Sequence, residues 1–282
     1  MKRFLATAAV LVALGTVGSA EAADLGVPPM VSPFIPAVPP PMLSWAACYI
    51  GANGGGKWFS TTSQSVNIPA ASGAAGITPA SSLFLPDTTT ISAIGGGQFG
   101  CNYQMGHVVF GFETDLDWQH VSNSFTVAPP APVLFVPGDS FTVTSHWQGS
   151  FRGRLGYAWD RVLFYGTGGL AYTRVNFATN FIPVGVFPAT VVTEGRTFGG
   201  VTLGGGIEYS FTNFLSLAIE GRYNWYGSQT FDSGVLTTAA ALVGNSIVFT
   251  TTPVTSTLKL NSAEVTARLN WRFNWGTVGA RY

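Results

Sequence analysis

The feature that most constrains this chain is a two-residue alternation of apolar and polar side chains, kept over unusually long segments. Residues 107–120 show it clearly. Their apolar side chains of one parity are Val108, Phe110, Phe112, Leu116 and Trp118. Their opposite parity carries Glu113, Asp115, Asp117 and Gln119. Successive side chains of a strand point to opposite faces, whereas a helical face repeats about every 3.6 residues. The sequence therefore predicts strands with one apolar and one polar face.

The same alternation recurs along the chain, more weakly in the glycine-rich segments. We expect eight strands, at residues 46–59, 91–103, 107–120, 141–158, 161–177, 196–211, 214–227 and 258–273. Tight turns connect three successive pairs, at residues 103–107, 158–161 and 211–214. Long connections rich in Thr, Ser, Ala, Gly and Pro occupy residues 60–90, 121–140, 178–195 and 228–257. Connections of alternating length predict an antiparallel sheet with all its long loops at one end.

The composition excludes several classes of protein. Charged residues make up only 9% of the chain, against about 25% in an average soluble protein. No stretch after residue 20 approaches the roughly 18 uncharged apolar residues that a membrane-spanning helix needs. The formal net charge is +0, so no basic surface is available to attract nucleic acid. A membrane protein that crosses with strands fits these limits.

We therefore predict an all-β, eight-stranded antiparallel transmembrane β-barrel of the outer-membrane type, with short periplasmic turns and four long extracellular loops. Each strand exceeds the roughly 9–11 residues of a tilted crossing, and closure leaves no unpaired sheet edge in lipid. A soluble antiparallel sandwich is the alternative. It is disfavoured because the apolar parity is uncharged along whole strands. Aromatic residues also gather near strand ends, as membrane-interface residues do: Trp58, Tyr103, Trp118, Tyr157, Trp225, Trp271 and Phe273.

The N-terminal segment predicts export. Lys2 and Arg3 precede an apolar run, and Ala20-Glu21-Ala22 fits a signal-peptidase site, so residues 1–22 are expected to be a cleaved signal peptide rather than a membrane anchor. Residues 23–44 are proline-rich and are expected to be a periplasmic linker, with a partner-binding polyproline motif as the alternative. The barrel is expected at 45–273, followed by a tail at 274–282. This organisation places the protein in the cell outer membrane.

Twelve charged residues share the polar parity of these strands. The basic residues are Lys57, Arg152, Arg154, Arg222, Arg268 and Arg272. The acidic residues are Glu113, Asp115, Asp117, Glu208, Glu220 and Glu264. The interior of an eight-stranded barrel is just wide enough for side chains to fill, and unpaired buried charges are costly. We therefore expect a paired charge network in the lumen. Charges lining an ion-selective pore are the alternative.

The ladder Glu113, Asp115 and Asp117 is also open to interpretation as a metal site or a catalytic carboxylate pair. Ion pairing with Arg152 and Arg154 on the next strand is the simpler explanation, because both arginines have the matching parity.

The sequence predicts no enzyme and no metal site. It contains no G-x-S-x-G, phosphate-binding loop or zinc-ligand spacing. Of the three histidines, His107 lies by a tight turn, His120 has lipid-facing parity, and His146 has lumen-facing parity. A dyad of His146 with Asp117 is conceivable, but a place in the interior hydrogen-bond network is favoured. We assign no catalytic residue.

The four long connections contain no His, Cys, Met or Tyr, the usual protein ligands of haem and many transition metals, so we expect no cofactor. Arg174, Arg196 and Lys259 lie at the ends of strands on the long-loop side. There they are candidates to contact lipopolysaccharide phosphates, because Arg and Lys bind phosphate oxygens well.

The two cysteines are expected at the same end of the first strand pair. Cys48 lies near the start of the first strand and Cys101 near the end of the second, both with lipid-facing parity. An exported protein meets an oxidising compartment. A Cys48–Cys101 disulfide is therefore predicted, with two unbonded apolar residues slightly out of register as the alternative.

Three motifs resemble the outer-membrane immunogenic protein family of Alphaproteobacteria, which are small porin-like surface antigens. They are residues 49–53 (YIGAN), 163–172 (LFYGTGGLAY) and 267–273 (ARLNWRF). The resemblance implies an eight-stranded barrel with periplasmic short turns, assembled by the outer-membrane insertion machinery. Some members are linked to haem binding. Such barrels usually end on an aromatic residue, a position that Phe273 or Tyr282 would fill.

Two functions fit this reading. The first is a structural and surface-interaction role in the cell envelope, in contact with outer-membrane lipid and lipopolysaccharide. The second is a small passive porin-like channel for ions or solutes. The balance of charges in the expected lumen favours the first.

Overall fold

The computed structural model describes residues 43–73, 76–131, 134–183, 189–243 and 246–273. The expected signal peptide, all but the last two residues of the linker, and the tail lie outside the described residues. Within the described part, the chain forms strands β1 (Ala47–Ile68), β2 (Ala71–Gly73), β3 (Gly76–Thr78), β4 (Ser81–Leu85), β5 (Thr88–Met105), β6 (Val108–Thr126), β7 (Ser140–Trp159), β8 (Val162–Phe181), β9 (Thr190–Ser210), β10 (Leu215–Val243) and β11 (Ser246–Phe273). None of these residues forms a helix long and apolar enough to span a membrane.

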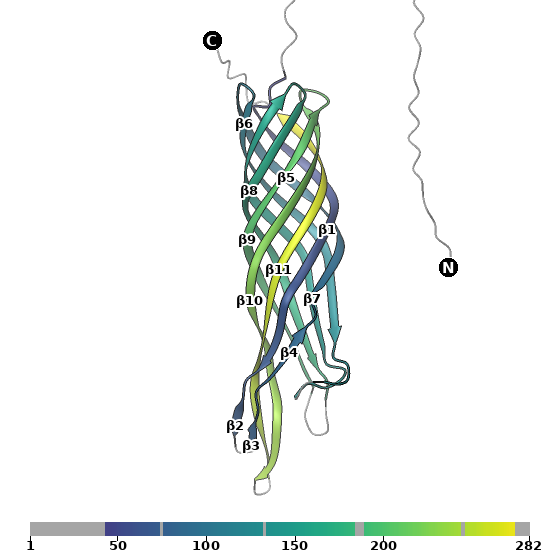
Figure 1. The fold of residues 1–282 in the computed structure, drawn as a ribbon, viewed down its shortest axis with the longest axis vertical. Coiled ribbons are helices and arrows are strands. Elements are labelled where there is room, and N and C mark those ends of the chain that lie inside the picture. Colours follow the sequence, from purple (N-terminus) through teal and green to yellow (C-terminus); the bar gives the residue numbers. More distant parts are fainter. Residues whose placement is uncertain (1–42, 74–75, 132–133, 184–188, 244–245, 274–282) are drawn as a thin grey trace, which may run out of the picture. The chain divides into compact units, whose positions relative to one another are not determined.

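Eight of the strands close into a ring, which confirms the predicted all-β antiparallel barrel (Figure 1). The order is β1-β5-β6-β7-β8-β9-β10-β11, and β11 returns to pair with β1. That closing ladder is antiparallel and runs from Cys48↔Phe273 to Asn67↔Thr255. A two-residue turn, Gly106-His107, joins β5 to β6, and Gly106 has a φ of +58°, which glycine adopts without steric cost.

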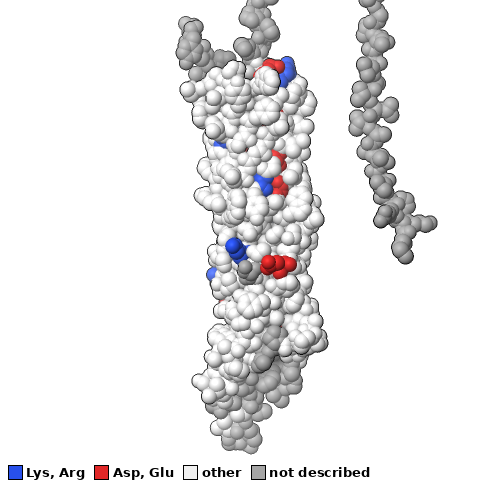
Figure 2. Space-filling model, in the orientation of Figure 1, with Lys and Arg blue, Asp and Glu red and all other residues white. Residues whose placement is uncertain are grey.

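Near the tight turns the wall of the barrel is apolar outside and polar inside. On β6, Phe112 is 43% exposed whereas the adjacent Glu113 is 3% exposed. The face drawn in Figure 2 is almost entirely uncharged. On β7, the outward aromatic residues Tyr157 and Trp147 stand ten residues apart, which matches the roughly 9–11 residues of a tilted membrane crossing. This part of the barrel meets the requirements of a lipid-facing wall.

The strands extend far beyond the expected bounds, so much of the expected loop sequence is strand. Residues 228–243 lie in β10 and residues 246–257 lie in β11. Residues 60–90 hold the end of β1, the β2–β3 hairpin, β4 and the start of β5. Figure 1 shows β2 and β3 beside the β10–β11 hairpin. These extensions were not expected, because the segments are rich in Thr, Ser, Ala, Gly and Pro and resemble loops in composition.

In the extended half the inside of the barrel is largely apolar. Its buried cluster consists of Phe59, Val66, Ile68, Leu83, Leu85, Val121, Val127, Phe135, Phe141, Val143, Ala171, Val175, Phe177, Phe181, Phe198, Tyr226, Phe231, Val254, Leu258 and Leu260. We call this set the upper core. Beyond a membrane, water surrounds the wall, and the hydrophobic effect then favours apolar side chains inside. The inversion of polarity along the barrel therefore marks where the lipid-facing part ends.

Two seams divide the wall around the upper core. The β5–β6 ladder ends at Ile94↔Gln119, and the β9–β10 ladder ends at Val201↔Trp225. Past these points the strands continue as two groups. One is β6-β7-β8-β9; the other is β1-β11-β10, in which β1 pairs on its other side first with the start of β5 and then with β4. Side chains hold the seams together: Ser92 Oγ donates to the His120 carbonyl at 2.8 Å, and Thr190 Oγ1 donates to the Val235 carbonyl at 3.2 Å.

A β-bulge in β7 reverses the face of its side chains. The register with β8 shifts between Ser145 and Trp147. As a result Phe141 and Val143 point inward and are buried, whereas Trp147 lies on the outer face. The alternation expected to continue along the strand at residues 141–158, which gave His146 its lumen-facing parity, is therefore wrong before the bulge, because an extra residue in one strand exchanges the two faces.

The upper core predicts a specific loss of stability. Phe177 is 1% exposed and its ring centroid lies 5.6 Å from that of Phe231. Phe177→Ala should lower the free energy of unfolding by about 3–5 kcal/mol, since it leaves a cavity in a packed core. Urea unfolding of the lipid-embedded protein measures this. Phe84→Ala is the control, because Phe84 is 77% exposed. Equal losses for the two variants would contradict a packed upper core.

Candidate functional site

The candidate site is the barrel interior between the tight turns and the upper core. Its polar side chains come from strands on all sides of the ring. The twelve charged residues named from the sequence are each at most 6% exposed. Burial of an ionised group is costly unless it is paired and hydrogen-bonded. The contacts of these groups therefore decide what the interior can do.

Three arginines form the centre of the network. Arg152 contacts Asp115 at 2.8 Å and Glu220 at 2.7 Å, and it also pairs with Glu113. Arg268 contacts Glu113 and Glu220 at 2.7 and 2.6 Å, respectively. Each guanidinium group thus joins carboxylates from different strands, a geometry that its fixed fork of donors allows.

The third arginine ties the network to its remaining acids. Arg222 contacts Asp115 at 2.6 Å, Glu264 at 2.5 Å and Asp117 at 3.4 Å. Three guanidinium groups therefore face five carboxylates, those of Glu113, Asp115, Asp117, Glu220 and Glu264. Polar neighbours donate hydrogen bonds to the carboxylates as well. Ser150 Oγ, for example, donates to Asp115 at 2.8 Å.

Several of these ion pairs cross the lumen. Asp115 on β6 and Arg222 on β10 lie on opposite sides of the ring, with three strands between them in either direction. Their contact at 2.6 Å places both side chains at the centre of the barrel. Arg152 on β7 also reaches Glu220 on β10, with two strands between them on one side of the ring and four on the other. The side chains thus fill the cross-section instead of lining its rim.

Arg154 makes a second, separate ion pair. Its partner is Glu208 on β9, so it does not neutralise the Glu113–Asp117 ladder as the sequence interpretation expected. Its guanidinium group also lies 3.6 Å from the ring centroid of Tyr165 and donates to the Tyr49 hydroxyl at 3.2 Å. Tyr49 in turn donates to Glu113 at 2.6 Å, which links this pair to the central network.

The remaining two cations have uncharged partners. Lys57 donates to the side-chain carbonyl of Gln148, whose amide nitrogen donates to Glu264 at 2.8 Å. Arg272 donates to Ser210 Oγ and to the Thr212 carbonyl at 2.9 Å. Gln148 shares the polar parity of the charged set, but parity alone does not identify which charged group each uncharged side chain contacts.

An apolar plug closes the mouth beside the tight turns. Trp45, just before β1, is fully buried. Its backbone N–H donates to Gln104 Oε1 at 2.6 Å, and its indole N–H donates to the Asp160 carbonyl at 3.3 Å. The Arg272 guanidinium group lies 4.7 Å from the Trp45 ring centroid. The charge network therefore lies between this plug and the upper core.

Glycines on the inner face make room for the network. A Cβ added at Gly204 would lie 2.8 Å from Arg222 Cγ, and one at Gly96 would lie 2.4 Å from Asp117 Oδ1. Atoms do not approach so closely without a shift of the neighbour. The glycine-rich strands thus reflect packing in the interior, where the large charged side chains occupy the space.

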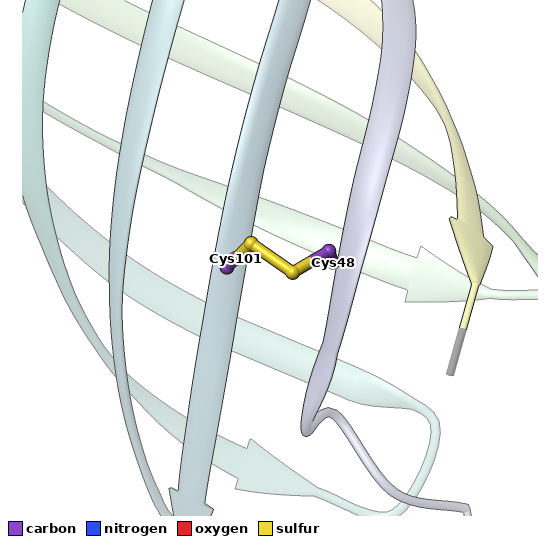
Figure 3. The surroundings of a disulfide bond; sticks show 2 residues. All are labelled: Cys48 and Cys101. Carbon is purple, nitrogen blue, oxygen red and sulfur yellow. A yellow bond between two sulfur atoms is a disulfide. The ribbon is translucent and has the colours of Figure 1, made fainter. Parts of the chain in front are cut away.

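Cys48 and Cys101 are bonded (Figure 3). They stand directly opposite each other in the β1–β5 ladder, with Cα atoms 3.9 Å apart. Both are half-buried on the outer face. The bond covalently fixes the register of β1 against β5.

His146 lies on the outer surface, so its assignment to the lumen is wrong. The β7 bulge turns it outward, and its ring stacks edge-on with that of His120. The conceivable dyad with Asp117 does not form. Asp117 instead accepts from Asn53 at 2.8 Å and pairs with Arg222. Within the described residues, no group of three or more His, Cys, Asp or Glu side chains could hold a metal ion.

The three basic residues that the sequence suggested as contacts for lipopolysaccharide phosphates do not form one cluster. Arg174 and Arg196 lie on the adjacent strands β8 and β9, whereas Lys259 lies on β11. All three are exposed. Arg196 contacts Glu194 at 2.7 Å, which partly satisfies its charge.

The buried network predicts a large cost for removing one arginine. Arg222→Met should lower the free energy of unfolding by about 3–5 kcal/mol, because it leaves buried carboxylates without their counter-ion. Arg196→Met removes an ion pair whose arginine side chain is 42% exposed and should cost at most about 1 kcal/mol. Urea unfolding in lipid vesicles compares the two. A loss for Arg222→Met no larger than for Arg196→Met would refute the network's energetic role.

Comparison with known proteins identifies the family. Residues 43–273 match the family model of the outer membrane protein beta-barrel domain. The 31 kDa outer-membrane immunogenic protein of Brucella melitensis is 34% identical over 220 residues, which cover 75% of this chain and 82% of that protein. The 22 kDa outer membrane protein of Rhizobium leguminosarum is 32% identical over 139 residues, 49% of this chain and 55% of that protein. The structure of the outer membrane protease OmpT from Escherichia coli is 9% identical with a TM-score of 0.42, and the match covers 80% of this chain and 97% of that one. The chain therefore belongs to the outer membrane protein beta-barrel family, among the outer-membrane immunogenic proteins of Alphaproteobacteria, and resides in the cell outer membrane.

Proposed function

We propose that this outer-membrane barrel is a closed structural element of the cell envelope that presents its extended half as a surface module. The observation that carries the proposal is the set of ion pairs across the lumen, of which Asp115–Arg222 at 2.6 Å is the clearest. A conducting pore needs a continuous water-filled path. Here paired side chains from opposite walls occupy the middle of that path.

Three successive layers support a closed lumen. Trp45 covers the mouth beside the tight turns, the ion network fills the middle, and the upper core packs the extended half. Opening a path would require breaking buried ion pairs and exposing aromatic side chains to water. Both changes are unfavourable. The alternative function is a passive channel for ions or small solutes, and a measurement of conductance distinguishes the two.

The extended half suits a role at the cell surface. It lies past the outward aromatic residues Trp118 and Trp147, and it carries the β2–β3 and β10–β11 hairpins. Barrels of this type place short turns in the periplasm and long connections outside, so these hairpins are proposed to face outward. Relatives of this chain are named immunogenic, which agrees with outward presentation.

The proposed role is not enzymatic. Catalysis of hydrolysis needs a nucleophile or bound water, a base and an orienting group within reach of one another. The interior carboxylates already engage arginines. His120 and His146 lie outside the barrel, away from those carboxylates.

The route to the membrane and the partners there are also proposed. Export through the signal peptide at residues 1–22 and assembly by the outer-membrane insertion machinery follow from the family. Outer-membrane lipid and lipopolysaccharide surround any such barrel. The particular contacts of Arg174, Arg196 and Lys259 with lipopolysaccharide phosphates stay a prediction.

Single-channel recording in planar bilayers tests the closed lumen. The folded protein should give no reproducible conductance steps. The double variant Arg152→Ala/Arg154→Ala removes one of the three central arginines and the separate Arg154–Glu208 pair. It should also give no steps when it retains the heat-modifiable mobility of a folded barrel, because Trp45 and the upper core still close the lumen. Reproducible steps from the unaltered protein, changed in size by the double variant, would instead establish a pore lined by these charges.

A further inference from the structure

Two histidines meet on the outer face of the barrel. His120 on β6 and His146 on β7 are both exposed. Their ring centroids lie 5.7 Å apart with the ring planes at 60°. The two residues are distant in sequence, and nothing in their spacing along the chain indicated a pair.

The β-bulge creates this pair. Trp118 faces Trp147 and Val121 faces Ser145 across the β6–β7 ladder, so two residues of β6 stand opposite His146 alone. The same residue has no partner in the β7–β8 ladder. Bulges commonly re-aim a side chain, and this one directs His146 outward beside His120. The Ser92 hydroxyl donates to the His120 carbonyl at 2.8 Å, which fixes the backbone there.

The ring nitrogens of the pair are free to bind a ligand. Within the described part of the chain, neither ring takes part in a hydrogen bond, and the two rings contact each other. His107 differs, because its Nδ1 lies 3.1 Å from the Ala158 carbonyl and its ring stacks on Tyr157. The chain has three histidines, so His107 is an internal comparison for the pair.

The surroundings of the pair leave room for a small ligand. The two rings border a shallow depression that is also lined by Ala93, Ile94, Gly95, Trp118 and Gln119. Ala93 and Gly95 are small, so no bulky side chain covers the β5 side of the depression. None of these lining residues carries a charge that would repel a cation.

We propose that His120 and His146 form a two-imidazole site for a divalent transition-metal ion. Two imidazoles that bind one ion through nitrogens at about 2.0–2.1 Å hold their ring centres about 5–6 Å apart, and the observed separation is 5.7 Å. Imidazole suits copper, nickel and zinc better than the hard cations magnesium and calcium. Because the described residues contain no cluster of three such ligands, water completes the coordination.

This site goes beyond the proposed envelope role and is independent of it. No metal site was expected from the sequence, because no ligand spacing along the chain indicates one and the parity of His146 predicted a place in the lumen. The bulge places the two ligands together across neighbouring strands. A metal bound here would lie beside Trp118, on the outside of the wall, and would leave the interior unchanged.

Titration with Cu²⁺ tests the site, because copper is bound most strongly among the first-row divalent ions. The full chain, prepared without a polyhistidine tag in detergent micelles, should bind one ion. Binding should quench tryptophan fluorescence, and the electron paramagnetic resonance spectrum should show coordination by two nitrogens. His120→Ala and His146→Ala should each weaken binding by about tenfold or more, since each removes one of two protein ligands.

His107→Ala is the matched control and should bind Cu²⁺ like the unaltered chain. Heat-modifiable mobility on gels shows that each variant is folded. The proposal is overturned if saturable binding is absent, if it persists in the His120→Ala/His146→Ala double variant, or if only one of the two single variants weakens it.

Discussion

The structure depends on the pairing of charges inside a narrow closed wall. Closure of eight strands satisfies every backbone group within the membrane, but it also creates an interior that side chains must fill. Here the filling is ionic, with Arg152, Arg222 and Arg268 each shared among carboxylates of several strands. Because a buried charge is tolerated only with its partner, each strand's inward residues constrain those of the opposite strands. The same contacts hold the wall together and occupy the lumen.

One part of the barrel wall faces lipid and the other faces water, and the polarity of the side chains changes accordingly. Between Tyr157 and Trp147 the outer face is apolar and the inner face is charged. Past Trp147 the inner face becomes the apolar upper core, while the wall divides along two seams. The bulge at His146 lies between these two parts of the barrel. Its one extra residue makes β7 side chains of the opposite parity point inward. The same extra residue brings His146 to His120, so a packing requirement and a proposed binding site arise from one irregularity.

Much of the fold was predictable from alternation and connection length. The eight-stranded antiparallel ring, the family and the outer-membrane location are confirmed. The strand extensions were not predicted, because segments such as residues 228–257 are rich in Thr, Ser, Ala, Gly and Pro and resemble loops in composition. Parity identified which charged residues share a face, but it could not show that Arg154 selects Glu208 over the acidic ladder. That choice depends on side-chain geometry across the lumen. The error at His146 has one cause, since a bulge leaves no strong mark in the sequence.

Chemical access to the lumen tests the central claim most directly. Ser150 is 2% exposed and touches both Asp115 and Arg222, so Ser150→Cys places a small thiol within the network. In a Cys48→Ser/Cys101→Ser background, a charged thiol reagent should modify this cysteine only after unfolding, whereas Thr193→Cys on the exposed wall of the extended half should react at once. Rapid modification of Ser150→Cys in the folded barrel, from either side of the membrane, would contradict a lumen filled by paired charges.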